Sequence, residues 1–311
     1  MQRLKLGISA CLLGERVRFN GGHKHSVLCS EVLAEHFELL PVCPEMAIGL
    51  GAPRPTIRLI GSSEAPRAVM AEHERDLTGA LQAQATRVPA DISGFVLMQK
   101  SPSCGLHRVK LYRDNGHLAE AGSRGVFAAA LHAARPELPL EEEGRLHDPV
   151  LRENFLNRVF VYGRWQRLLA AGLTRQGLID FHARHKYLLM ATHSQQQKAL
   201  GRLLSDLGRH APEDIAPRYF SQLMAALSRR ATRGTHSNVL QHLSGYLRPH
   251  LGNAERGELQ HLIEQYRSGI VPLVVPLTLL RHHFKRHPHA YVANQDYLHP
   301  YPDALSLRNA I

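Results

Sequence analysis

The feature that most constrains the fold is a cysteine that follows a short apolar run at three places in the first half of the chain. The runs and the cysteines that follow them are 4–9 with Cys11, 38–42 with Cys43, and 94–98 with Cys104. Short apolar runs bounded by turn residues are typical of buried strands. Because ligands bind outside the carboxyl ends of parallel strands, we expect the three cysteines to converge at one edge of a sheet.

The rest of the first half alternates between strand and helix patterns, which predicts a right-handed parallel, Rossmann-like α/β domain over residues 1–147. The further elements that we expect are helices over 26–37, 72–87 and 123–134, short strands over 56–60, 67–70, 109–112 and 117–119, and an edge strand over 138–140. The Asp-Asn-Gly sequence at 114–116 indicates a hairpin.

The pattern of apolar residues changes near residue 148, and beyond it long stretches have the spacing of helices. The acidic run 141–143 and the pair Asp148-Pro149 indicate a boundary, with Asp148 as the cap and Pro149 as the first residue of a helix. We therefore predict an all-α domain over residues 148–311. Its tail from His287 is rich in Pro, Tyr and Asn, and we expect it to cover the surface as extended chain.

Charge is distributed unevenly between the two halves. Residues 1–150 hold 17 Lys and Arg and 17 Asp and Glu, whereas residues 151–311 hold 21 and 10, so the whole formal charge of +11 lies in the second half. Such asymmetry indicates a polyanionic partner such as RNA, although a basic surface without a specific target gives the same count. The basic residues that we expect to contact phosphates are Arg229, Arg230, Arg233, Arg281, Lys285 and Arg286.

Neither a membrane span nor a disulfide framework is expected. No stretch approaches the roughly 20 apolar residues of a transmembrane helix, and the N-terminus lacks the form of a signal peptide. Four scattered cysteines in a chain of 311 residues are typical of a reducing compartment. We therefore expect a soluble, cytoplasmic protein.

The three strand-end cysteines are either small buried residues or ligands of a metal. Three thiolates can hold a catalytic zinc with one open position, or three irons of a [4Fe–4S] cluster whose fourth iron is open. Glu45 and Ser101 lie beside candidate ligands, where a carboxylate can act as general acid or base and a hydroxyl can position water; alternatively they cap backbone amides. Cys29 lies in an expected helix among apolar residues, which favours packing.

Three motifs, 9–14, 43–45 and 100–105, resemble in this order those of the thiouracil desulfurase family, over about residues 1–145. The resemblance implies a small α/β domain that carries a [4Fe–4S] cluster. The open iron binds the sulfur of a thiocarbonyl, and water converts C=S to C=O with release of hydrosulfide and no net electron transfer. The implied cluster ligands are Cys11, Cys43 and Cys104, and the implied catalytic residues are Glu45, Ser101 and, less directly, Ser103.

Residues 181–191 resemble the signature of a helical domain long classed as of unknown function. The fusion is similar to two-domain bacterial tRNA 4-thiouridine desulfidases, which implies tRNA as partner and thiolated uracil as the base acted upon. Free thiouracil or a thionucleoside is the alternative substrate. A different alternative is a non-catalytic RNA-binding protein with a structural or redox-sensing cluster or zinc. We expect His182 and His185 to pack or to contact phosphate rather than to bind a metal.

Overall fold

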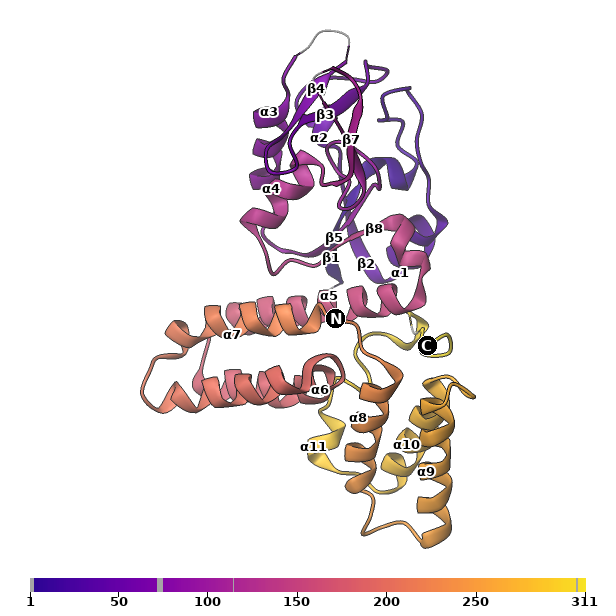
Figure 1. Cartoon of the computed structure of the whole chain (residues 1–311). Coiled ribbons are helices and arrows are strands. Elements are labelled where there is room, and N and C mark those ends of the chain that lie inside the picture. Colours follow the sequence, from indigo (N-terminus) through magenta and orange to yellow (C-terminus); the bar gives the residue numbers. More distant parts are fainter. Residues whose placement is uncertain (1–2, 72–74, 114, 306) are drawn as a thin grey trace. The chain divides into compact units, whose positions relative to one another are not determined.

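The computed structural model describes residues 3–71, 75–113, 115–305 and 307–311 (Figure 1). The chain divides into two compact units, Met1–His147 and Asp148–Ile311. The first unit is α/β and the second is helical, so the predicted fold class is confirmed.

The first sheet is wholly parallel and contains the three strands that precede cysteines. Its order is β2-β1-β5-β8. The bounds of its strands are Leu4–Ser9 for β1, Phe37–Val42 for β2, Ile92–Leu97 for β5 and Leu140–Glu142 for β8. Every residue of β5 is buried, as expected for a central strand covered on both faces. The shared direction places the carboxyl ends of β1, β2 and β5 at one edge.

The second sheet, β4-β3-β6-β7, is built from two hairpins. The strands are β3 (Ile57–Gly61), β4 (Pro66–Met70), β6 (Val109–Tyr112) and β7 (Leu118–Ser123). The second hairpin lies on either side of the predicted turn at 114–116, although Asp114 lies outside the described residues. The inner strands β3 and β6 pair in parallel and bury Leu59 and Leu111 in a small core of their own.

Short helices connect the strands of the first unit. These are α1 (Ala34–His36) with the π-helical turn Leu28–Leu33 before it, α2 (Pro44–Ala47), α3 (Thr78–Ala83) and α4 (Val126–Ala134). The prediction of a helix over 72–87 is wrong at its start, in part because Asp76 forms a bridge to Val69 and accepts from the Thr78 N–H at 2.8 Å. Residues 72–74 of that prediction lie outside the described part.

The acidic run 141–143, which marks the expected domain boundary in the sequence, forms the end of the last strand and the start of the 3-10 helix that follows it. Glu141 and Glu142 end β8, and all three carboxylates are buried with partners. Glu142 Oε1 accepts from the backbone N–H groups of Leu106 at 2.8 Å and His107 at 2.9 Å. Buried carboxylates persist only where donors satisfy them, and here the donors come from distant segments.

The second unit consists of helices joined by short loops. They are α5 (Pro149–Ala170), α6 (Arg175–Ser205), α7 (Pro212–Leu227), α8 (Arg233–Gly245), α9 (Asn253–Arg267), α10 (Val274–Arg286) and α11 (Ala290–Ala293). Asp148 caps α5 as predicted, accepting from Val150 N at 2.8 Å. In Figure 1, α6 and α7 lie side by side. Within the described residues, no helix has both the length and the apolarity that a membrane crossing requires.

The tail beyond His287 is not surface-covering extended chain; this prediction is wrong. Tyr297 is fully buried, and Asp296 lies 2.8 Å from Arg184 Nε and 3.1 Å from His185 Nε2. Tyrosines and charged residues suggest an exposed segment by composition, yet here they pair with one another inside the helical core. His185 is fully buried and packs in this core, and His182 Nδ1 lies 3.2 Å from the Tyr219 hydroxyl.

Candidate functional site

A cavity of about 510 Å³ lies at the carboxyl ends of β1, β2 and β5, and Cys11, Cys43 and Cys104 all line it. Each cysteine sits where a strand gives way to a turn. Cys11 belongs to the short 3-10 helix that follows β1, Cys43 is the N-cap of α2, and Cys104 follows β5 in a turn. The structure thus brings together three residues separated by 32 and 61 positions in the chain. Cys29 is fully buried in its helix and does not line this cavity.

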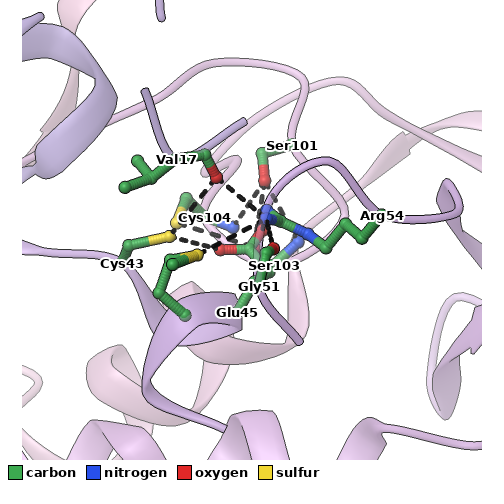
Figure 2. Close-up of polar contacts among 9 residues, drawn as sticks. Val17, Cys43, Glu45, Gly51, Arg54, Ser101, Ser103 and Cys104 are labelled. Carbon is green, nitrogen blue, oxygen red and sulfur yellow. Dashed lines mark hydrogen bonds and ion pairs between the residues drawn. The ribbon is translucent and has the colours of Figure 1, made fainter. Parts of the chain in front are cut away.

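Glu45 links the cysteines to two serines through a chain of hydrogen bonds (Figure 2). The Cys43 thiol lies 3.3 Å from Glu45 Oε2, and the Ser103 hydroxyl donates to Glu45 Oε1. Ser101 Oγ lies 3.0 Å from Ser103 Oγ, and Ser103 Oγ is also 3.6 Å from Cys104 Sγ. Because Ser101 and Glu45 line the cavity, protons can move along this chain to and from its interior.

Arg54 completes the surroundings of Glu45, and sequence reasoning missed it. Its Nη2 lies 4.0 Å from Glu45 Oε1, while its Nη1 donates to the carbonyls of Val17 at 2.9 Å and Gly51 at 2.7 Å. The guanidinium is therefore fixed next to the carboxylate and is almost fully buried. The available signal was a charged residue between Pro53 and Pro55 in a loop that otherwise lacks charge.

The turn that carries Cys104 is held by the start of α4. The N–H groups of Val126 and Ala128 donate to the carbonyls of Pro102 at 3.1 Å and Ser103 at 3.0 Å. Gly125 permits this approach, because a Cβ built there would lie 2.5 Å from the Ser103 carbonyl oxygen. Within the turn, Ser101 Oγ accepts from Cys104 N at 3.1 Å. Ser101 is thus both a cap for the turn and a hydroxyl on the cavity wall.

The same environment keeps the cysteines protonated when they are free thiols. Burial, followed by the nearby Glu45 carboxylate, raises the pKa of Cys11 to about 11 and of Cys43 to about 12. The same two causes raise the pKa of Cys104 well above its ordinary value. Thiols of this kind are poor nucleophiles at neutral pH, so the site does not resemble that of an enzyme with a catalytic cysteine. A strongly charged metal centre would be needed to hold them as thiolates.

The donor set fits an iron–sulfur cluster, because three soft thiol donors line one cavity. Within the described residues, no three Cys, His, Asp or Glu side chains form a group that could hold a single metal ion. A cluster spreads its thiolates more widely because each binds a different iron, and three soft donors around a large cavity suit it.

Comparisons with known proteins match each half of the chain to a different family. The 2-thiouracil desulfurase family model matches residues 6–143, and the model of a protein family of unknown function, DUF1722, matches residues 186–302. The chain therefore combines a 2-thiouracil desulfurase domain with a DUF1722 domain, a two-domain, thiouracil desulfurase-like architecture. The desulfurase domain contains every strand described above and the whole cysteine cavity.

Two relatives show how far the likeness extends. The uncharacterized protein YbgA of Escherichia coli K12 is 33% identical over 159 residues, which are 51% of this chain and 94% of YbgA. A solved structure, titled as the [4Fe-4S]-dependent thiouracil desulfidase TudS, is 28% identical. The match covers 48% of this chain and 95% of TudS, with a TM-score of 0.37.

The basic residues predicted to contact RNA fall into two kinds. Arg229, Arg230 and Lys285 are exposed. Arg233 instead donates to the carbonyls of Tyr266 and Val271, and Arg281 donates to the carbonyl of Leu298. The sixth residue, Arg286, is exposed but lies 3.9 Å from Glu255. These hydrogen bonds tie Arg233 and Arg281 to their own unit, although Arg233 is still exposed, and contact with RNA stays a prediction for all six residues.

Proposed function

We propose that this desulfurase acts on 4-thiouridine in tRNA, and that Cys11, Cys43 and Cys104 hold a [4Fe–4S] cluster whose fourth iron is open. The observation that carries the proposal is the cavity in which the three thiols meet the hydrogen-bonded chain of Glu45, Ser103 and Ser101. Water supplies the oxygen of the product carbonyl, and sulfur leaves as hydrosulfide with no change in oxidation state. The carbonyl product and hydrosulfide can therefore both form without an electron donor.

A bound cluster would supply a Lewis-acidic iron suited to the thiocarbonyl sulfur. The chain's own residues provide the proton transfers. Glu45 accepts the proton that water loses when it attacks the substrate carbon. Until then, the Arg54 guanidinium, 4.0 Å away, stabilises the charged carboxylate of Glu45. Ser103 then relays protons between Glu45 and Ser101, whose hydroxyl reaches the cavity.

The lining of the desulfurase cavity favours a substrate that carries phosphate. Arg18, Lys24 and Lys100 also line it, and none of the three has an ion-pair partner among the described residues. Among the described residues that line the wall, Glu45 is the only acidic one. A free thiobase would have no use for three cations, whereas a nucleotide within RNA brings phosphates to meet them.

The DUF1722 unit offers further cationic surface. Lys285 lines a cavity of about 530 Å³ together with His282, His289 and His299, while Arg281 on the same wall is paired with Asp303 at 3.7 Å. Arg229 and Arg230 lie exposed after α7. A target base in folded tRNA has to be unstacked at a cost of a few kcal/mol, and phosphate contacts elsewhere on the RNA can offset it.

The decisive test is an anaerobic turnover assay with thiolated tRNA, 4-thiouridine monophosphate, 4-thiouridine and free 4-thiouracil at equal concentrations. We expect hydrosulfide release with kcat/KM highest for tRNA. The Glu45→Ala variant should keep its iron and lose turnover by roughly 10²–10⁴-fold, the usual range for an acid–base residue. No turnover of any substrate by a fully iron-loaded protein would favour the non-catalytic alternative, and equal kcat/KM for tRNA and the free base would refute the RNA substrate.

A further inference from the structure

An aromatic side chain at the desulfurase cavity takes no part in the proton transfers. Phe19 lines the cavity and is 42% exposed. Among the described residues that line the wall, it is the only aromatic one and the only large apolar side chain that is exposed. Single apolar residues are often exposed on protein surfaces, so exposure alone assigns no role to Phe19. Its position on the wall makes it a candidate contact for the substrate.

The loop that carries Phe19 is held in place by backbone hydrogen bonds. The Arg18 N–H donates to the Gly22 carbonyl at 3.1 Å, which closes a turn around Phe19. The Arg54 N–H donates to the Phe19 carbonyl at 2.7 Å, and the Arg54 guanidinium donates to the Val17 carbonyl at 2.9 Å. The ring is therefore presented by a backbone that is already ordered, which lowers the entropic cost of binding a ligand against it.

The position of Phe19 is coupled to that of the catalytic carboxylate. The guanidinium that holds the loop also lies 4.0 Å from Glu45 Oε1, so Arg54 fixes both the loop and the surroundings of Glu45. The Arg18 guanidinium lies 5.6 Å from the centroid of the Phe19 ring, a cation–π contact that restricts how the ring can turn. A partly exposed aromatic plane, fixed relative to Glu45, is suited to a flat ligand.

We infer that Phe19 stacks on the pyrimidine ring of the substrate and so orients its thiocarbonyl group in the cavity. The inference rests on the proposed function, because it assigns a contact to the base that is desulfurated. Arg18, Lys24 and Lys100 on the wall can meet phosphates but do not recognise the flat face of a base. Aromatic stacking supplies that recognition, and it selects a planar thiocarbonyl ring over a non-planar or aliphatic thioamide.

The test measures binding of the product nucleotide by calorimetric titration of the full chain, purified anaerobically, so that no turnover is needed. The probes are uridine 5′-monophosphate and its 5,6-dihydro analogue, which keeps the carbonyls and the N–H group but has a saturated, puckered ring. The wild type should bind the planar nucleotide at least about fivefold more tightly, the lower end of the range that base–aromatic stacking gives.

Phe19→Leu keeps an apolar side chain and removes the aromatic face. It should weaken binding of uridine 5′-monophosphate by at least about fivefold and should bind both nucleotides alike, whereas Phe19→Tyr should restore the preference. The matched control is Leu118→Ala, because Leu118 is also an exposed apolar residue of the first unit, at 53%, but does not line the cavity. It should bind both nucleotides like the wild type.

Three outcomes would overturn the inference. These are no binding of uridine 5′-monophosphate to the wild type at millimolar concentration, equal affinity of the wild type for both nucleotides, and unchanged affinity in Phe19→Leu. If Phe19→Leu then impairs turnover of thiolated tRNA alone, the ring contacts a neighbouring base of the RNA instead. Unfolding midpoints separate lost binding from lost folding. A wild type that shows the Phe19-dependent preference but desulfurates no substrate would refute the proposed function and leave the stacking contact standing.

Discussion

Glu142 joins the last strand of the sheet to the segment that follows Cys104, and replacing it tests how much this link stabilises the first unit. Its carboxylate is buried and accepts from two backbone N–H groups, at 2.8 and 2.9 Å, in the segment that follows Cys104. A hydrogen bond to a charged group contributes about 1.5–3 kcal/mol, so Glu142→Ala should lower the free energy of unfolding of the first unit by about 3–6 kcal/mol. Glu142→Gln keeps an acceptor and loses the charge, and should cost about half as much.

The assay is denaturant unfolding of the full chain, followed by a probe in each unit because two units need not unfold together. Iron content after anaerobic reconstitution is the second readout, and it should fall in the order wild type, Glu142→Gln, Glu142→Ala as the cysteine turn loses its anchor. The matched control is Glu38→Gln on β2, whose side chain is 56% exposed and lies 3.9 Å from Lys5. If Glu142→Ala and Glu38→Gln shift the transition equally, the two hydrogen bonds are not what holds the segment.

Four further predictions concern the cluster, the turn, the helical unit and RNA. Replacing Cys11, Cys43 or Cys104 by serine should abolish iron binding, measured by iron analysis of each purified variant. Gly125→Ala should destabilise the first unit by about 1–3 kcal/mol in denaturant unfolding, because its Cβ would overlap the Ser103 carbonyl. Burial lowers the pKa of His236 from 6.5 to about 3, so the folded protein disfavours its protonation. The free energy of unfolding should therefore fall as pH falls below 6.5, by about 2 kcal/mol at pH 5. His236→Gln should flatten this pH dependence, measured by unfolding at a series of pH values. Replacing Arg229 and Arg230 by Gln should weaken the salt dependence of tRNA binding. In a salt titration, the slope of log K (the association constant) against log salt concentration should become shallower by about one unit for each phosphate contact that is lost.

For each of these four predictions, a control variant or a specific result would contradict the reasoning. Cys29→Ser should keep its iron, and near-normal iron in a variant of the other three would exclude that residue as a ligand. Gly79→Ala, where a Cβ has no neighbour within 4 Å, should not destabilise, so an equal loss in both glycine variants would count against the overlap. A pH dependence unchanged in His236→Gln would assign the acid sensitivity to other groups. An unchanged salt slope would place the RNA-binding surface elsewhere.

The sheet and the position of the cysteines could be predicted because they depend on short-range patterns. A strand buried on both faces contains a continuous apolar run, as 94–97 is within β5, and the turn that follows such a strand lies at the edge of the sheet. Glu45 and Ser101 could be singled out because they adjoin cysteines in the chain. These inferences needed no knowledge of how distant segments pack.

Arg54, Glu142 and the tail could not be predicted, because their roles arise only from distant contacts. Glu142 bonds to backbone groups 35 and 36 positions away, and in the sequence it belongs to an acidic run of the kind that usually marks a solvated boundary. Composition describes the average environment of a residue type, whereas a buried charge is decided by a specific partner. The same reason explains why Arg233 and Arg281, predicted to face RNA, donate to carbonyls of their own unit.

The ion pair between Arg308 and Glu153 joins residues 155 positions apart, from the tail and the first helix of the second unit. Synthesis proceeds from the N-terminus, so this contact forms only when almost the whole helical unit has left the ribosome. The first unit completes its sheet once β8 has emerged, at residues 140–142. The nascent chain can therefore close its cysteine cavity while its second unit still lacks the residues that finish its core.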